Sequence, residues 1–239
     1  MREARVLYEQ PAKRKSTLVC FDFDQTILNE HSHNQIKCKQ LSNFSEHIEA
    51  DYLGELINQE PDGVFKNREK LLETFNLFFE QGHNIAITSF TEYKSLIIPV
   101  LKFLGLSKEQ LSKIHVEAWL PKTQDYMSKF GKNGHIRKAM DHFKVNEYQL
   151  VMLIDDSINN IEIAKHNNIK TVLVSTKHNP DPAYLDESVK LGEELIKQAT
   201  AKDNEPEVLT SKEKNTSWVA RENVRNYNQL GSNQLGLNL

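Results

Sequence analysis

The fold is decided by residues 17–28, whose sequence is TLVCFDFDQTIL. The segment from Thr17 to Phe21 is almost wholly apolar, which is typical of a strand buried on both faces in a parallel sheet. Asp22 and Asp24 follow directly, and side chains two positions apart lie on one side of an extended chain, so both carboxylates can reach one ligand. Open α/β sheets bind ligands at the carboxyl ends of their strands. The stretch therefore predicts a binding site, although an isolated Asp-x-Asp can also be a plain surface turn.

The composition indicates one well-packed domain with appendages. The chain has 239 residues, of which 38% are hydrophobic and 26% charged,. A net charge of −3 shows no overall signature of a nucleic-acid or membrane-surface partner,. The cysteines are Cys20 and Cys38, and the first lies in the expected buried strand, so we expect a reducing compartment and no disulfide framework,.

The chain shows no apolar stretch long enough to span a membrane, and residues 1–17 lack the apolar core of a signal peptide,. We therefore expect a soluble, cytoplasmic protein, or one delivered elsewhere without a cleavable signal of that type. Four segments differ in composition and periodicity: a polar lead-in (1–16), a main domain (17–201) that contains a small insert or flap without a clear period (29–63), and a tail rich in Asn, Gln, Ser, Lys and Glu that we expect to be disordered (202–239),.

Four further apolar segments resemble strands, and helical periodicity lies between them. The expected strands are 17–21, 84–88, 114–119, 150–154 and 171–174; the expected helices include 71–79, 93–104, 136–143, 158–164 and 186–201,. Pro99 should kink or split the second helix,. The expected stripe of the last helix is Val189 and Ile196 with Leu195 at its edge, and Gly192 on the same stripe weakens the prediction,. The alternation predicts an α/β fold: a doubly wound parallel five-stranded sheet with helices on both faces.

Polar residues gather where these strands end. Thr88 and Ser89 close the second strand, and their hydroxyls can bind a phosphate oxygen or cap the next helix,. Asp155 and Asp156 close the fourth strand, where two adjacent carboxylates repel each other unless a cation neutralises them,.

A basic turn ahead of the fourth strand offers Lys129 and Lys132, of which Lys132 lies nearer the helix start. Acids, hydroxyls and a lysine would then converge on one pocket. His31 and His33 have no further Cys or His at a ligand spacing beside them, so we interpret them as part of a polar loop,.

These motifs, in this order, resemble those of the haloacid dehalogenase (HAD) superfamily of phosphatases over residues 16–178. The first motif corresponds to Asp22-x-Asp24-x-Thr26, the second to Ser89 or Thr88, the third to Lys132 or Lys129, and the fourth to Asp155-Asp156. The resemblance implies that Asp22 is a nucleophile forming an aspartyl-phosphate and that Asp24 is the acid and base for the leaving group and the attacking water.

The resemblance also implies a magnesium ion held by Asp22, the main-chain carbonyl of Asp24, and Asp155 or Asp156. The hydroxyl and the lysine would bind the phosphoryl oxygens. Electrostatics agrees, because a phosphate dianion repels a carboxylate nucleophile unless a divalent cation and a lysine neutralise the pocket. The dehalogenating members lack the second aspartate, so Asp24 favours phosphoryl chemistry.

Two non-phosphatase alternatives remain at this point. A receiver-like signalling module also gathers acids and a lysine at the ends of a five-stranded parallel sheet, but it would lack the acid/base Asp24. A non-catalytic scaffold would tolerate loss of the metal-binding acids, and their presence disfavours it.

The spacing of the motifs leaves little room for a cap domain. Residues 29–63 would be cramped as a full helical cap, and the interval from Ser89 to Lys132 leaves no space for one,. The layout is similar to magnesium-dependent phosphatase-1, and with its polar tail it would also fit an effector phosphatase of the kind that Legionella delivers into host cells.

An open site admits a phosphorylated protein or peptide. We expect phosphotyrosine to be preferred, because it extends furthest from the backbone and Phe90 or Phe23 could contact its ring,. The alternative is a small-metabolite phosphatase acting on a sugar phosphate or nucleotide, with residues 29–63 as a lid.

Overall fold

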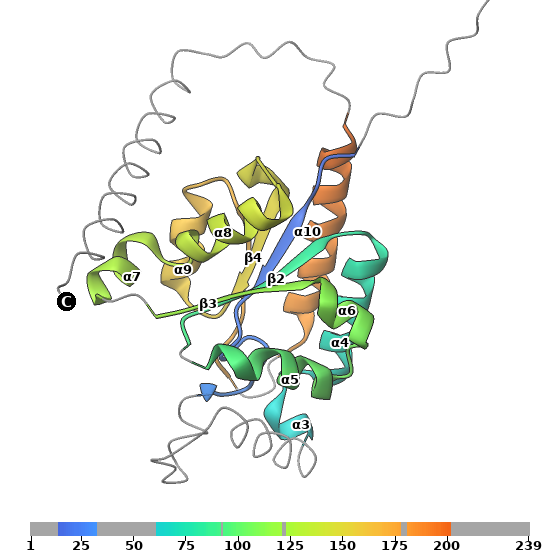
Figure 1. Ribbon diagram of the computed structural model, residues 1–239, viewed down its shortest axis with the longest axis vertical. Coiled ribbons are helices and arrows are strands. Elements are labelled where there is room, and N and C mark those ends of the chain that lie inside the picture. Colours follow the sequence, from blue (N-terminus) through green and yellow to red (C-terminus); the bar gives the residue numbers. More distant parts are fainter. Residues whose placement is uncertain (1–13, 33–60, 92, 121–122, 178–180, 202–239) are drawn as a thin grey trace, which may run out of the picture. The chain divides into compact units, whose positions relative to one another are not determined.

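The computed structural model describes residues 14–32, 61–91, 93–120, 123–177 and 181–201, which belong to one compact unit (Figure 1). The predictions for the start of the lead-in, for residues 33–60 of the insert and for the tail fall outside the described residues, as do His33 and Cys38. Every helix in the described ranges is too short or too polar to cross a membrane.

A five-stranded parallel sheet forms the centre of the fold, in the order β3-β2-β1-β4-β5. The strands are β1 (Leu18–Phe21), β2 (Asn84–Ser89), β3 (Ile114–Ala118), β4 (Val151–Asp155) and β5 (Lys170–Leu173). All five lie where the sequence predicts them, with ends that differ by a residue or two. The predicted α/β fold class is confirmed.

The register of the central strands places the site residues at one level. Phe21 of β1 pairs with Ile87 of β2 and with Ile154 of β4. The ladder continues one step further, because the N–H of Asp22 donates to the carbonyl of Ile154 at 2.9 Å. Asp22 therefore leaves the sheet next to the carboxyl ends of both neighbours, as the sequence predicts.

Helices cover both faces of the sheet. They are α3 (Pro61–Val64), α4 (Arg68–Glu80), α5 (Lys94–Leu104), α6 (Lys108–Lys113), α7 (Gln124–Phe130), α8 (Asn133–Phe143), the 3-10 turn η1 (Tyr148–Leu150), α9 (Ile158–Lys165) and α10 (Ala183–Thr200). Pro99 lies inside the continuous α5, so the helix is not split.

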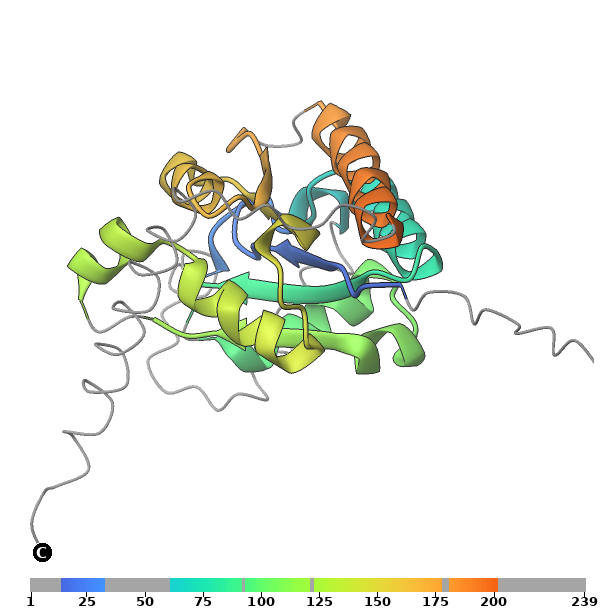
Figure 2. The same cartoon turned by 90° about the horizontal axis from the view of Figure 1, so that it is seen from above.

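Alternate side chains of β1 belong to two separate hydrophobic cores, one on each face of the sheet, as expected for a strand buried on both faces. Val19 and Phe21 pack with apolar residues of α4, α5 and α10. Leu18 and Cys20 face the opposite side, where residues of α8 and α9 cover the sheet. Figure 2 shows α4 and α10 side by side on the first of these faces.

The contact between α10 and α4 depends on a glycine. Gly192 is buried, and a Cβ there would lie 2.7 Å from Cε1 of Phe78 on α4. The predicted stripe of α10 is shifted: Val189 and Ile196 are only half-buried, whereas Leu195, predicted at its edge, is buried. The buried side is formed by Tyr184, Leu185, Ser188, Gly192, Leu195 and Ala199. Gly192 thus marks close packing of two helices.

Candidate active site

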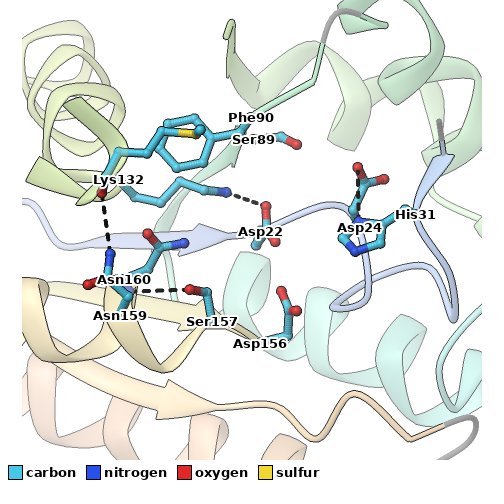
Figure 3. A pocket seen from close by; sticks show the side chains of 11 residues that line it. Asp22, Asp24, His31, Ser89, Phe90, Lys132, Asp156, Ser157, Asn159 and Asn160 are labelled. Atoms are coloured by element: carbon cyan, nitrogen blue, oxygen red, sulfur yellow. Dashed lines mark hydrogen bonds and ion pairs between the residues drawn. The ribbon is translucent and has the colours of Figure 1, made fainter. Parts of the chain in front are cut away.

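The turn after β1 directs its two acids differently from the aromatic residue between them. The N–H groups of Ile27 and Leu28 donate to the carbonyl of Phe23 at 3.0 and 3.1 Å, which closes a tight helical turn. Phe23 is fully buried in the core, so it cannot contact a substrate ring. Asp22 and Asp24 line a pocket instead (Figure 3).

Lys132 is the cation at the floor of this pocket. It precedes α8, and its side chain is 2% exposed. Its Nζ donates to Asp22 Oδ1 and to the carbonyl of Thr88 at 2.6 Å, and lies 3.7 Å from Asp155 Oδ2. Burial lowers the pKa of Lys132, but the carboxylates of Asp22 and Asp155 outweigh that effect and raise it. Lys132 therefore remains charged when buried.

Asp22, Asp155 and Asp156 form a cluster in which one oxygen of each lies within 4.8 Å of the others. Burial raises the pKa of Asp22 to about 7, against the lowering effect of Lys132. Burial likewise raises the pKa of Asp155 to about 6, and burial with the charge of Asp155 raises that of Asp156. The cluster thus carries more negative charge than Lys132 offsets, and a hard divalent cation with oxygen ligands such as Mg²⁺ fits it.

Asn160 holds the cluster in place, a role that the sequence analysis missed. Its Nδ2 donates to both carboxylate oxygens of Asp155, at 3.0 and 3.2 Å, and the N–H of Ser157 donates to Oδ1 at 2.8 Å. Gly131 leaves room for this amide, since a Cβ there would lie 3.0 Å from Asn160 Oδ1. The sequence feature that could have indicated this role is the position of Asn160, three residues after Ser157, the residue that caps α9.

Asp24 lies outside the carboxylate cluster, toward the pocket rim. The N–H of Ser32 donates to its Oδ1 at 2.9 Å, and His31 Nδ1 lies 3.9 Å from its Oδ2. His31 itself lines the pocket, which the interpretation as a polar loop did not anticipate.

Each pair of alternative phosphate-binding candidates is separated by the structure. Ser89 lines the pocket, whereas Thr88 is fully buried, with its Oγ1 3.5 Å from the carbonyl of Phe21. Lys129 is exposed at the end of α7 and pairs with Asp125 at 3.0 Å, away from the pocket that Lys132 lines. The structure thus brings Ser89 and Lys132 to the pocket, whereas Thr88 lies in the core and Lys129 in solvent.

The cavity above these groups has a volume of about 220 Å³. Phe90 and Met127 are the apolar residues of its lining, and the other lining residues are polar. Its lining comprises Asp22, Asp24, His31, Ser89, Phe90, Met127, Lys132, Asp156, Ser157, Asn159 and Asn160.

Stacked rings support Phe90 from behind. Its ring meets that of His135 edge to face at 4.9 Å, and His135 stacks on Trp119 at 4.1 Å and 9°. Lys132 Nζ lies 5.0 Å from the centroid of Phe90. Burial lowers the pKa of His135 to about 3, so this ring is neutral. The ring of Phe90 is therefore held in place by the rings behind it.

Comparisons with known proteins reveal similarity only at the level of structure. No protein-family model and no curated protein sequence matches the chain. The HAD domain of the effector protein Lem4 from Legionella pneumophila is 16% identical, with a TM-score of 0.54 over 79% of this chain and 99% of that domain. An inactive mutant of that domain gives 14% identity and a TM-score of 0.52 over 77% and 98%. Together with the strand order and the helices on both faces, this likeness shows that the chain has the α/β fold of the HAD superfamily.

Proposed function

We propose that the protein is a Mg²⁺-dependent phosphatase that hydrolyses phosphomonoesters through an aspartyl-phosphate on Asp22. One observation carries this proposal: Asp22 is buried at the end of β1 between Lys132 and the acids Asp155 and Asp156, in a pocket that Asp24 also lines. Nucleophile, phosphate-binding cation, metal-binding acids and a proton donor are then present in one place.

Asp22, Asp155 and Asp156 would hold the magnesium ion, with the main-chain carbonyl of Asp24 as the further ligand that the family resemblance suggests. When bound, the ion supplies positive charge that lets a phosphate dianion approach the carboxylates. Lys132 supplies the charge contributed by the protein itself, and the Ser89 hydroxyl can donate to a phosphoryl oxygen,.

In the first step, an oxygen of Asp22 attacks phosphorus while the bond to the leaving oxygen breaks and that oxygen takes a proton from Asp24. In the second step, Asp24 accepts a proton from water as the water attacks phosphorus, which releases inorganic phosphate and restores Asp22. The N–H of Ser32 donates a hydrogen bond to Oδ1 of Asp24. Because Oδ1 is already an acceptor there, we assign the proton transfer to Oδ2.

We propose phosphotyrosine in a protein or peptide as the preferred substrate. Phe90, backed by His135 and Trp119, offers an aromatic surface in the pocket that the phosphate-binding residues line, and Met127 is a further apolar residue of that lining. An aromatic leaving group would stack there, whereas phosphoserine presents no ring. The phosphotyrosine side chain is also longer than that of phosphoserine, so its phosphate would reach Asp22 at the bottom of the pocket.

Steady-state kinetics on matched phosphotyrosine, phosphoserine and phosphothreonine peptides, beside sugar phosphates and nucleotides, test both levels of the proposal. Phosphotyrosine peptides should have the highest kcat/KM, Asp22→Asn should abolish turnover, and excess chelator should stop it until Mg²⁺ is restored. A metabolite tenfold or more above the best peptide would overturn the substrate class and favour the metabolite alternative. Activity in Asp22→Asn on every substrate would overturn the covalent mechanism.

The strand order argues against the receiver-like alternative. A receiver has the order 2-1-3-4-5, in which the first strand lies between the second and the third. Here β1 lies between β2 and β4. Asp24 also lines the pocket. A receiver-like module retains its phosphoryl group and would not need such an acid and base.

A further inference from the structure

Three side chains on α8 and just before it alternate with two aromatic rings. Lys132, His135 and Lys138 recur every third residue from the start of α8, a spacing that places neighbouring side chains on one face of a helix,. Lys132 Nζ lies 5.0 Å from the centroid of Phe90, and the ring of His135 meets that of Phe90 at 4.9 Å. His135 stacks on Trp119 at 4.1 Å, and Lys138 Nζ lies 5.0 Å from the centroid of the Trp119 ring. This series, which we call the α8 ladder, runs from the pocket, where the side chain of Lys132 is 2% exposed, to the surface, where that of Lys138 is 58% exposed.

His135 is the middle member of the α8 ladder and is fully buried. Its Nε2 lies 3.2 Å from the carbonyl oxygen of Trp119, and because a carbonyl only accepts hydrogen bonds, Nε2 carries the proton,. Nδ1 is then an acceptor that has no hydrogen-bond partner among the described residues. A buried polar atom without a hydrogen bond costs free energy, so an apolar residue would fill this position at lower cost. What the histidine offers instead is a ring whose orientation is fixed by the hydrogen bond to Trp119.

The main chain of Trp119 ties the α8 ladder to the pocket a second time. Its N–H donates to the carbonyl of Ser89 at 3.2 Å. Ser89 and Phe90 are adjacent in sequence, and both line the pocket. Phe90 is therefore held both through its own backbone neighbour and through the ring of His135.

The α8 ladder thus keeps an aromatic ring at a fixed distance from the phosphate-binding cation. Phe90 lies beside Lys132 (Figure 3), whose Nζ also donates to Asp22. A ring bonded directly to the ester oxygen, as in phosphotyrosine, can lie against Phe90 while its phosphate lies beside Lys132. An alkyl ester such as phosphoserine has no ring to place there and gains nothing from the arrangement.

We propose that His135 is a specificity-determining residue, a positioning residue that acts through Phe90 to favour aryl over alkyl phosphomonoesters. This inference rests on the proposed phosphatase function and its preference for phosphotyrosine. The competing explanation is ordinary core packing, in which His135 stabilises α8 and has no influence on the choice of substrate.

His135→Leu and His135→Phe separate these explanations. Leucine removes the ring, whereas phenylalanine keeps a ring for the contacts with Phe90 and Trp119 and lacks the hydrogen bond. The measured quantity is the ratio of kcat/KM for matched phosphotyrosine and phosphoserine peptides, which a loss of folded protein alone leaves unchanged. His135→Leu should lower this ratio about two- to tenfold, the contribution expected of one aromatic pair, and His135→Phe should lower it less.

A double-mutant cycle tests whether His135 acts through Phe90. In the Phe90→Leu background, His135→Leu should not change the ratio further, because the ring that it positions is absent. His142→Leu is the matched control, since His142 is also on α8 and stacks on a different ring, that of His115, at 4.2 Å. This control should leave the ratio unchanged.

Core packing predicts a different pattern: kcat/KM falls equally for both peptides, in step with a lower thermal midpoint, and the ratio stays constant. That pattern would overturn the proposal, as would an effect of His135→Leu that persists in the Phe90→Leu background. If neither His135 variant folds, Trp119→Leu replaces them, because it removes the ring on which His135 stacks, and an unchanged ratio in that variant contradicts the proposal. A wild-type protein that hydrolyses neither peptide contradicts the proposed phosphatase function itself, and one that hydrolyses both equally contradicts the preference for phosphotyrosine.

Discussion

Lys129 and Lys132 are three residues apart, the first in the last turn of α7 and the second directly before α8, and their surroundings are opposite. Lys132 is buried against Asp22, whereas the side chain of Lys129 is 64% exposed and pairs with Asp125. The sequence alone indicates that a lysine from this segment enters the site, but which one depends on Gly131. Its positive φ of 48° reverses the chain between α7 and α8 and directs the next side chain inward,.

Lys132→Ala should therefore lower kcat/KM by roughly 10²- to 10³-fold, because it removes a preorganised charge from a buried site. Lys129→Ala, its control, should change kcat/KM by less than about twofold. The two variants are compared on the same substrate, with circular dichroism to confirm that each is folded. Equal losses would mean that Lys132 is not the phosphate-binding lysine.

Ser89 and Thr88 form a similar pair of neighbours on β2, with side chains on opposite faces of the strand. Removing the hydroxyl that lines the pocket should matter, so Ser89→Ala should lower kcat/KM by about 10²-fold. Thr88→Val keeps the shape of a buried side chain and should leave kcat/KM within about fivefold, with any cost appearing in stability. A larger kinetic loss in Thr88→Val than in Ser89→Ala would reverse the assignment.

At the scale of elements, the sequence predicts the strands and the longer helices, whose apolar residues recur periodically, and misses the short helices. The five strands and the five longer helices have apolar patterns that packing against a sheet requires,. The six residues of α6 have no buried face, and the helix is held by a capping box between Ser107 and Gln110,. The helix α7 is similarly short and capped by Thr123, so hydrophobic periodicity could not predict either.

The same limit applies to contacts between elements. Gly192 weakens α10 by propensity, and its reason becomes visible only where α4 brings Phe78 against it,. The rings of Trp119 and His135 behind Phe90 likewise come from separate parts of the chain.

Asn160 and His31 lie near Asp155 and Asp24 in sequence, but it is the folding of the intervening turns that brings the side chains together. Sequence motifs identify the groups that carry chemistry, and packing identifies the groups that hold them.

Gly192→Ala should destabilise the protein by about 1–3 kcal/mol, although alanine is the better helix former, because the added methyl forces α10 and Phe78 apart,. Glu193→Ala, on the exposed side of the same helix, should change stability by no more than about 0.5 kcal/mol,. Denaturant unfolding of both variants gives the comparison. A stabilised Gly192→Ala would show that the helices do not pack this closely.

At the scale of the whole molecule, the buried acids that suit the chemistry work against stability. In the protein without a divalent cation, the folded-state pKa of Asp22 is raised to about 7 and that of Asp155 to about 6. Both exceed the ordinary aspartate value of about 3.9 that applies to the unfolded chain. The folded state then binds more protons between about pH 4 and pH 7, so these two groups make it less stable as pH rises through that window.

Mg²⁺ should reverse this pH dependence, because it binds the ionised carboxylates and competes with protons for them. Each pH unit below the pKa of a ligand costs about 1.4 kcal/mol of metal binding, so stabilisation by Mg²⁺ should be small at pH 5 and largest at about pH 8. Thermal midpoints with excess Mg²⁺ and with chelator, measured at both pH values, give the difference directly. Asp155→Asn removes one titrating ligand and should abolish most of the gain at the higher pH. A Mg²⁺-dependent shift that is equal at both pH values, or greater in acid, would mean that the ion binds somewhere other than the cluster of Asp22, Asp155 and Asp156.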